Sequence, residues 1–144
     1  MIDNKPPVNN VLFLCTGNSA RSSMAEAILN KIGAPRYRAF SAGSHPKEAV
    51  HPEALRLLAR QGYETEGLHP KSWEEFRSAP AFTHIVTVCS NVAGEACPVI
   101  PGSAKTLHWE IPNPAAIAGK PEEVAAAFRA VYDMLYERIE EFVG

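Results

Sequence analysis

A cysteine and an arginine stand at the two ends of a short segment near the start of the chain, in the stretch VLFLCTGNSARSS. Cys15 follows an apolar run that is typical of a buried strand, and Arg21 begins a run whose pattern predicts a helix. The segment between them therefore lies at a helix N-terminus, where unpaired backbone amides and the helix dipole favour anions. These residue types at this spacing indicate a nucleophile held against a bound oxyanion.

Each part of this segment has a chemical task in that interpretation. Gly17 lets the backbone curl so that successive amides converge on one oxyanion, and the guanidinium of Arg21 grips two of its oxygens. The positive field is expected to favour the thiolate form of Cys15. The alternative is that Cys15 is a small core residue and Arg21 a solvated helix residue. The residues expected to bind the oxyanion are Thr16, Gly17, Asn18, Ser19, Ala20, Arg21 and Ser22.

Two further cysteines lie in the stretch TVCSNVAGEACPVIPG. Cys89 follows another apolar strand, so it is expected at the same edge of the sheet as Cys15, where the two sulfurs can exchange. The spacing between Cys89 and Cys97 is not that of a zinc site, and no paired histidine follows. Two inert, buried cysteines remain the alternative to a redox pair.

The elements that position these residues alternate between strands and helices. Strands are expected at Asn10–Leu14, Tyr37–Ser41, Thr83–Val88 and Lys105–Leu107. One helix is expected over Glu53–Gln61, closed by Gly62, and a last helix carries an apolar stripe at Val124, Phe128, Val131, Leu135, Ile139 and Phe142. The pattern predicts an α/β fold, a single-domain, doubly wound sheet of about four parallel strands with helices on both faces. Ligands of such sheets bind at the carboxyl ends of the strands.

Composition narrows the class of protein. With 144 residues and 46% hydrophobic content, the chain suits one domain over residues 10–144, preceded by a short extension over residues 1–9. A formal net charge of −2 and the absence of a long basic run argue against a nucleic-acid partner. No apolar run or signal-peptide pattern indicates a membrane or export, so a cytoplasmic protein is expected. Its 3 cysteines favour redox or catalytic use over a disulfide framework.

Four stretches of this chain, LCTGNSARS, SAG, VTVCSNVAGEACP and HWEIPNPAA, together resemble one family. They are similar to the arsenate reductases built on the low-molecular-weight protein tyrosine phosphatase fold. The resemblance runs from about Val11 to the final helix. A Cys-x5-Arg loop alone would indicate only a phosphatase-like site, and the later cysteine pair favours arsenate reduction.

The resemblance implies a mechanism without a cofactor. Cys15 attacks arsenate, Cys89 then attacks Cys15 and arsenite leaves, and Cys97 finally moves the disulfide to Cys89–Cys97. Thioredoxin or a similar thiol reductant closes the cycle, and phosphate or sulfate competes with arsenate. Asn18 and Ser22 match family positions that shape the loop and hydrogen-bond the thiolate.

Two positions depart from the family. Ala20 stands where many relatives carry a further cysteine, which is not one of the relay positions. Asn113 stands where the family usually has the aspartate that serves the phosphatases as general acid, and an amide cannot transfer that proton. Hydrolysis of phosphate esters is expected to suffer more than arsenate reduction. Glu110 lies near Asn113 in the sequence and is the carboxylate that would have to substitute for the missing acid.

Some relatives also hold a potassium ion beside the loop. The groups that correspond to its ligands are Asn18, Glu26 and Ser41, and Lys71 stands at the place of a further acidic ligand. We therefore expect no required metal.

Two other functions remain open from the sequence. One is a protein tyrosine or small-molecule phosphatase. Against it, the segment SHPKEAVHPEA lacks the aromatic residue on which a phosphotyrosine ring would pack. The other is a non-catalytic, oxyanion-binding regulatory protein.

Overall fold

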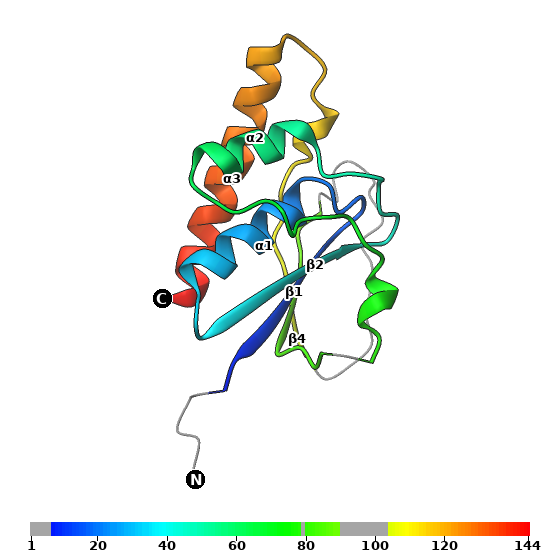
Figure 1. Ribbon diagram of the computed structural model, residues 1–144, viewed down its shortest axis with the longest axis vertical. Helices are drawn as coiled ribbons and strands as arrows, with labels where there is room; N and C mark the ends of the chain where they lie inside the picture. The colour runs from blue at the N-terminus through cyan, green and yellow to red at the C-terminus, as the bar shows by residue number, and fades with distance from the viewer. Residues whose placement is uncertain (1–6, 79, 90–103) are drawn as a thin grey trace.

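Four parallel strands form the single sheet of the computed structural model, which describes residues 7–78, 80–89 and 104–144. The spatial order of the strands is β2-β1-β3-β4 (Figure 1). Their bounds are β1 (Asn9–Cys15), β2 (Tyr37–Gly43), β3 (His84–Thr87) and β4 (Lys105–His108). The predicted strands are confirmed, but the sequence placed Cys15 just after the first strand. Cys15 is instead the last residue of β1, where it pairs with Gly43 of β2.

The two faces of the sheet are covered differently. The helices α1 (Arg21–Ile32), α2 (Pro52–Arg60) and α3 (Pro121–Val143) pack on the face that receives the odd-numbered side chains of β1. The even-numbered side chains of β1, Leu12 and Leu14, lie in a second apolar cluster with aromatic residues of the 3-10 helix η1 (Trp73–Phe76). In the described part of the chain, α-helices therefore cover one face and a 3-10 helix covers the other.

Local sequence signals account for the helix ends. Pro52 begins α2, and His51 before it accepts a hydrogen bond from the Glu53 amide at 3.1 Å. Gly62 closes this segment with a φ of 85°, in the left-handed region that glycine adopts readily. The expected stripe of α3 is confirmed, since its middle residues Phe128, Val131, Leu135 and Ile139 are buried.

The order of the strands creates a topological switch point between β1 and β3. The chain moves from β1 to β2 on one side and later to β3 on the other side, so a crevice opens at their carboxyl ends. Leu14 pairs with Thr87 across these strands, and the Val88 amide donates to the Leu14 carbonyl at 2.8 Å. Cys15 and Cys89 therefore lie at the same edge of the sheet, as the sequence pattern predicts.

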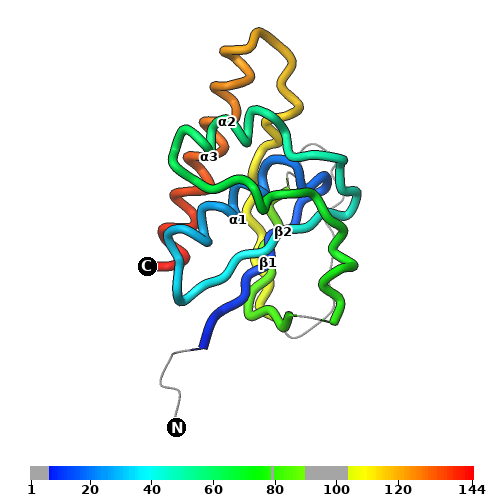
Figure 2. Tube along the Cα trace, in the orientation of Figure 1, coloured from blue at the N-terminus to red at the C-terminus, as the bar shows by residue number. Residues whose placement is uncertain are grey.

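The segments that follow β1 and β2 lie side by side at this edge. The Cα trace in Figure 2 shows the turn after β1, in blue, next to the turn after β2, in cyan. A hydrogen bond of 2.9 Å from the His45 amide to the Thr16 carbonyl joins them. None of the helices in the described part of the chain is long and apolar enough to cross a membrane.

Candidate active site

The loop between β1 and α1 is held in place by hydrogen bonds that its backbone carbonyls accept from a neighbouring segment. Four hydrogen bonds of 2.8 to 3.3 Å reach it from the segment after β2. They run from the amides of Ser44, His45, Lys47 and His51 to the carbonyls of Cys15, Thr16, Gly17 and Ser19, respectively. Because these carbonyls are engaged on the outer side, the loop does not turn their negative ends toward an anion.

Backbone conformation in the loop differs from the sequence expectation. The residue with a positive φ is Asn18, at 49°, and not Gly17. Asparagine tolerates this left-handed region because its short side chain can hydrogen-bond locally. Gly17 instead makes room for a neighbour, since a β-carbon there would lie 3.2 Å from Cγ of Lys47.

Gly43 is a structural requirement of the loop that sequence reasoning missed. A β-carbon on Gly43 would lie 2.5 Å from the carbonyl oxygen of Thr16, a backbone atom that cannot rotate away. The Gly43 amide donates to the Lys71 carbonyl at 2.9 Å, which fixes the strand end from its other side. The SAG stretch contributes only to the family resemblance above, although a glycine at a strand end beside a loop is a signal of close approach.

A chain of hydrogen bonds leads to the sulfur of Cys15. The Lys71 amide can only donate, and it donates to Oδ1 of Asn18 at 2.9 Å. Nδ2 of Asn18 therefore faces Ser22 and donates to its Oγ at 2.8 Å. That leaves the Ser22 hydroxyl to donate to Sγ of Cys15, 2.9 Å away. The Asn18 amide donates to the same sulfur at 3.2 Å. Two donors thus converge on Cys15, an arrangement that complements a thiolate acceptor.

Arg21 is buried at the start of α1, with 3% of its surface exposed. Its Nη1 donates to the carbonyl of Ile111 at 3.1 Å, in the segment after β4. The Ile111 amide in turn donates to the carbonyl of Cys89 at 3.3 Å. The guanidinium is therefore held in place by the ends of two other strands.

These parts enclose a small pocket of about 260 Å³. This volume lies below the range of roughly 300–1,000 Å³ that is usual for drug-sized ligands, so the pocket suits a small one. Ser22 is fully buried beneath the loop and reaches the sulfur of Cys15. The residues that line the pocket are Cys15, Thr16, Gly17, Asn18, Ser19, Ala20, Arg21, His45, Lys47 and Asn113.

The structure describes two of the three cysteines, and both are free thiols. Cys89 is fully buried, with its Sγ 3.9 Å from the Leu14 carbonyl, one residue before Cys15. Both sulfur-bearing residues belong to the same apolar cluster on the helical face of the sheet. Cys97 lies outside the described residues.

Asn113 lines the pocket, and the family resemblance places it where the phosphatases have their general acid. Its Oδ1 accepts a hydrogen bond from the Ala115 amide at 3.1 Å and so caps the short 3-10 helix η2 (Pro114–Ala116). Glu110 is exposed and does not line this pocket. The described geometry therefore brings an amide, and not a carboxyl group, to the mouth of the pocket.

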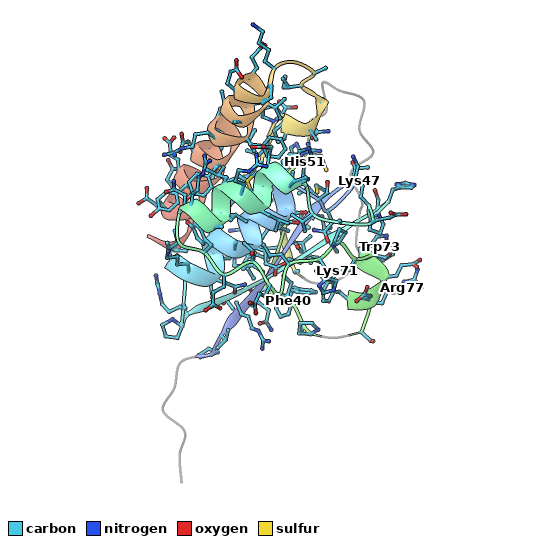
Figure 3. The ribbon with its side chains drawn as sticks, turned by 45° about the horizontal axis from the view of Figure 1, so that its top comes forward. Phe40, Lys47, His51, Lys71, Trp73 and Arg77 are labelled. Atoms are coloured by element: carbon cyan, nitrogen blue, oxygen red, sulfur yellow. The ribbon has the colours of Figure 1, made fainter. Side chains whose placement is uncertain are left out.

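A half-buried acid and a lysine stand behind the loop, at the position expected for a potassium ion. Ser41 donates its hydroxyl to Oε1 of Glu26 at 2.5 Å. Burial raises the pKa of the Glu26 carboxyl, while the Ser41 hydrogen bond and the charge of Lys71 oppose this change. Nζ of Lys71 (Figure 3) donates to the carbonyls of His69 at 2.9 Å and Ser41 at 3.3 Å. An ammonium group thus already brings positive charge to this place.

No cluster of three or more histidine, cysteine, aspartate or glutamate residues that could bind a metal occurs in the described ranges.

Replacing Gly43 by alanine tests whether its close approach holds the loop. Because the new methyl group would overlap the Thr16 carbonyl, we expect the free energy of unfolding to fall by about 1–3 kcal/mol. We also expect inorganic phosphate to protect Cys15 less well from alkylation by iodoacetamide. The matched control is Gly67→Ala, where a β-carbon meets no atom within 4 Å. Unchanged phosphate protection in Gly43→Ala would contradict this account of the loop.

Comparisons with known proteins agree with this geometry. Residues 10–144 match the low molecular weight phosphotyrosine protein phosphatases. An arsenate reductase from Halalkalibacterium halodurans is 33% identical over 132 residues, which cover 92% of this chain and 93% of that protein.

Solved structures extend the likeness to the fold. The arsenate reductase of Archaeoglobus fulgidus is 34% identical with a TM-score of 0.76, covering 93% of this chain and 98% of that one. A thioredoxin-dependent arsenate reductase from Corynebacterium glutamicum is 27% identical with a TM-score of 0.61, covering 93% of this chain and 63% of that one. By its sequence and its fold, the chain belongs to the arsenate reductases of the low molecular weight phosphotyrosine protein phosphatase family.

Proposed function

We propose that this protein reduces arsenate to arsenite with Cys15 as the nucleophile. The observation that carries the proposal is the position of the Cys15 sulfur. It receives hydrogen bonds from Ser22 and the Asn18 amide at a small pocket that Arg21 also lines. Cys89 lies two residues after the end of the neighbouring strand β3, at the same edge of the sheet. The family relationship to arsenate reductases supports the same assignment.

The first step forms a covalent bond between sulfur and arsenic. Arg21 and the loop from Thr16 to Ser22 hold the oxyanion, and the Cys15 thiolate attacks arsenic. One arsenate oxygen leaves as hydroxide or, after protonation, as water. The arsenic is still pentavalent at this stage, so no electrons have been transferred.

Reduction takes place in the second step. The Cys89 thiolate attacks the sulfur of Cys15 and forms a disulfide, while the bond between sulfur and arsenic breaks. Its electron pair stays on arsenic, which leaves as arsenite. Two cysteine sulfurs have then lost two electrons together, and arsenic has gained them.

The third step restores the nucleophile. Cys97 attacks Cys89, forms the Cys89–Cys97 disulfide and releases the Cys15 thiolate. A dithiol reductant of the thioredoxin type then reduces this disulfide. The thioredoxin-dependent reductase among the similar structures supports that choice of partner. A reaction that needs reduced thiols also fits the cytoplasm, where disulfides are kept reduced.

The function is tested by measuring arsenite formation with thioredoxin, thioredoxin reductase and NADPH, beside hydrolysis of p-nitrophenyl phosphate. We expect arsenite from the wild-type protein and none from Cys15→Ser, because the nucleophile is lost. Phosphate and sulfate are expected to inhibit competitively. Hydrolysis of the ester without any arsenite would identify a phosphatase. Phosphate binding without either reaction would identify a non-catalytic oxyanion-binding protein.

The relay is tested by the variant Cys97→Ser. We expect it to release one equivalent of arsenite and then to stall with a Cys15–Cys89 disulfide, because no third thiol relieves Cys89. Mass spectrometry after alkylation of the remaining thiols identifies the trapped pair. Cys89→Ser is the matched control and is expected to release no arsenite by this route. Sustained turnover of Cys97→Ser with thioredoxin would show that Cys97 is dispensable.

Asn113 separates arsenate reduction from phosphatase chemistry, which the family model also includes. In Asn113→Asp, one carboxylate oxygen can still cap η2 through the Ala115 amide, so the local fold is expected to remain. The new carboxyl group can protonate an alkoxide leaving group, and general acid catalysis is typically worth about 10²–10⁴-fold. We expect p-nitrophenyl phosphate hydrolysis to rise by more than arsenate reduction. Equal changes in both rates, or no change in either, would contradict this role of position 113.

A further inference from the structure

We propose that Lys47 is a substrate-binding residue whose ammonium contacts the outward-facing oxygen of the bound oxyanion. This contact selects a small, free oxyanion over a phosphate ester with an aryl group. The inference rests on the proposed function and deepens it, because it names the outward-facing oxygen as the feature of the substrate that the pocket recognises. Anion binding can nevertheless be measured without any turnover.

The position of Lys47 is set by the loop itself. Its amide donates to the Gly17 carbonyl at 3.0 Å, so its backbone is tied to the oxyanion loop. A β-carbon on Gly17 would lie 3.2 Å from Lys47 Cγ and 3.3 Å from Cε, so the lysine stem runs across this glycine. Lys47 is one of the residues that line the pocket, together with Cys15 and Arg21. Figure 3 places Lys47 at the same end of the molecule as His51, the residue before α2.

Lys47 supplies positive charge at the rim of the pocket, near His51. Burial, and then the charge of Lys47, lowers the pKa of the His51 imidazole, which favours a neutral ring beside the loop. Lys47 is exposed, and in the described parts of the chain it forms no ion pair with a carboxylate. Its ammonium is therefore available to an anion in the pocket.

The direction of attack explains why this charge can discriminate between substrates. Arg21 and the loop surround the oxygens nearest to Cys15, and in-line attack places the leaving oxygen on the opposite side, toward the open rim. In free arsenate or phosphate that oxygen is ionised or carries a hydroxyl group, so an ammonium can bind it. In an aryl ester the same oxygen carries a ring and has little charge.

A ring at the rim gains less from this lysine than a charged oxygen does. An exposed cation over an aromatic ring is a weak contact, whereas a charge-assisted hydrogen bond is among the stronger polar ones. Among the described residues that line the pocket there is no phenylalanine, tyrosine or tryptophan. The rim is thus built for a charged or hydroxylic oxygen.

Ligand protection of Cys15 tests the proposal without arsenate reduction. The rate of Cys15 alkylation by iodoacetamide is measured against the concentration of inorganic phosphate or of phenylphosphonate, which gives a Kd for each probe. Lys47→Met keeps the stem over Gly17 and removes only the charge. We expect its Kd for phosphate to rise about tenfold, the size of one charge-assisted hydrogen bond. Its Kd for phenylphosphonate is expected to change less than twofold.

Two further variants control this measurement. Lys47→Arg keeps the positive charge and is expected to retain most of the phosphate affinity. Lys105→Met removes a charge from the start of β4, at the opposite edge of the sheet, and is expected to bind both probes as the wild type does. An unchanged phosphate Kd in Lys47→Met overturns the proposal. An equal loss for both probes overturns the selectivity.

The outcome is separate from that of the proposed function. If the wild-type protein produces no arsenite but Lys47→Met loses phosphate affinity selectively, arsenate reduction is wrong and the binding role of Lys47 stands. If the wild-type protein reduces arsenate while Lys47→Met keeps its phosphate Kd, the proposed function stands and the binding role of Lys47 is wrong. With an active wild type, Lys47→Met is also expected to raise KM for arsenate about tenfold.

Discussion

The site depends on one buried residue, Asn18, whose polar groups all have partners. Its amide reaches Cys15, its carbonyl accepts from Ser23 at 3.1 Å, and its side chain joins the Lys71 amide to Ser22. The residue is fully buried in a left-handed conformation, so the surrounding hydrogen bonds compensate for both desolvation and backbone strain. Loss of any one bond would leave a buried polar group unpaired, which is more costly than the bond itself is favourable. The loop is therefore rigid before any anion arrives.

The support for Asn18 extends into the sheet and behind it. Lys71 holds Asn18 through its amide and holds the carbonyls of Ser41 and His69 through its ammonium. Ser41 in turn binds Glu26 on α1. The loop thus rests on α1 and β2 through a polar cluster. The positive charge of this cluster is the ammonium group of Lys71. A preformed site of this kind can favour a developing oxyanion without reorganising during the reaction.

The position of the two described cysteines follows from strand topology. Parallel strands end at the same edge, and the switch point between β1 and β3 brings Cys15 and Cys89 to that edge. An amide at position 113 and a lysine at position 47 give the mouth of the pocket a different character from a phosphatase that needs an acid and an aromatic shelf. The same fold and the same kind of oxyanion loop can therefore carry a different set of groups at the mouth of the pocket.

The sequence by itself determined the strands, the helices and the Cys15 to Arg21 loop, because apolar periodicity and helix-end signals are local properties of a few residues. It did not reveal that Asn18, and not Gly17, takes the left-handed conformation, since both residue types tolerate it. Only the tertiary structure joined Asn18 to the Lys71 amide 53 residues away, and Arg21 to the Ile111 carbonyl 90 residues away. It also brought Gly43 against Thr16 and Lys47 against Gly17. The physical reason is that one partner in each of these contacts is a backbone amide, a carbonyl or the space beside a glycine, and the sequence does not say which distant segment the fold will bring to it.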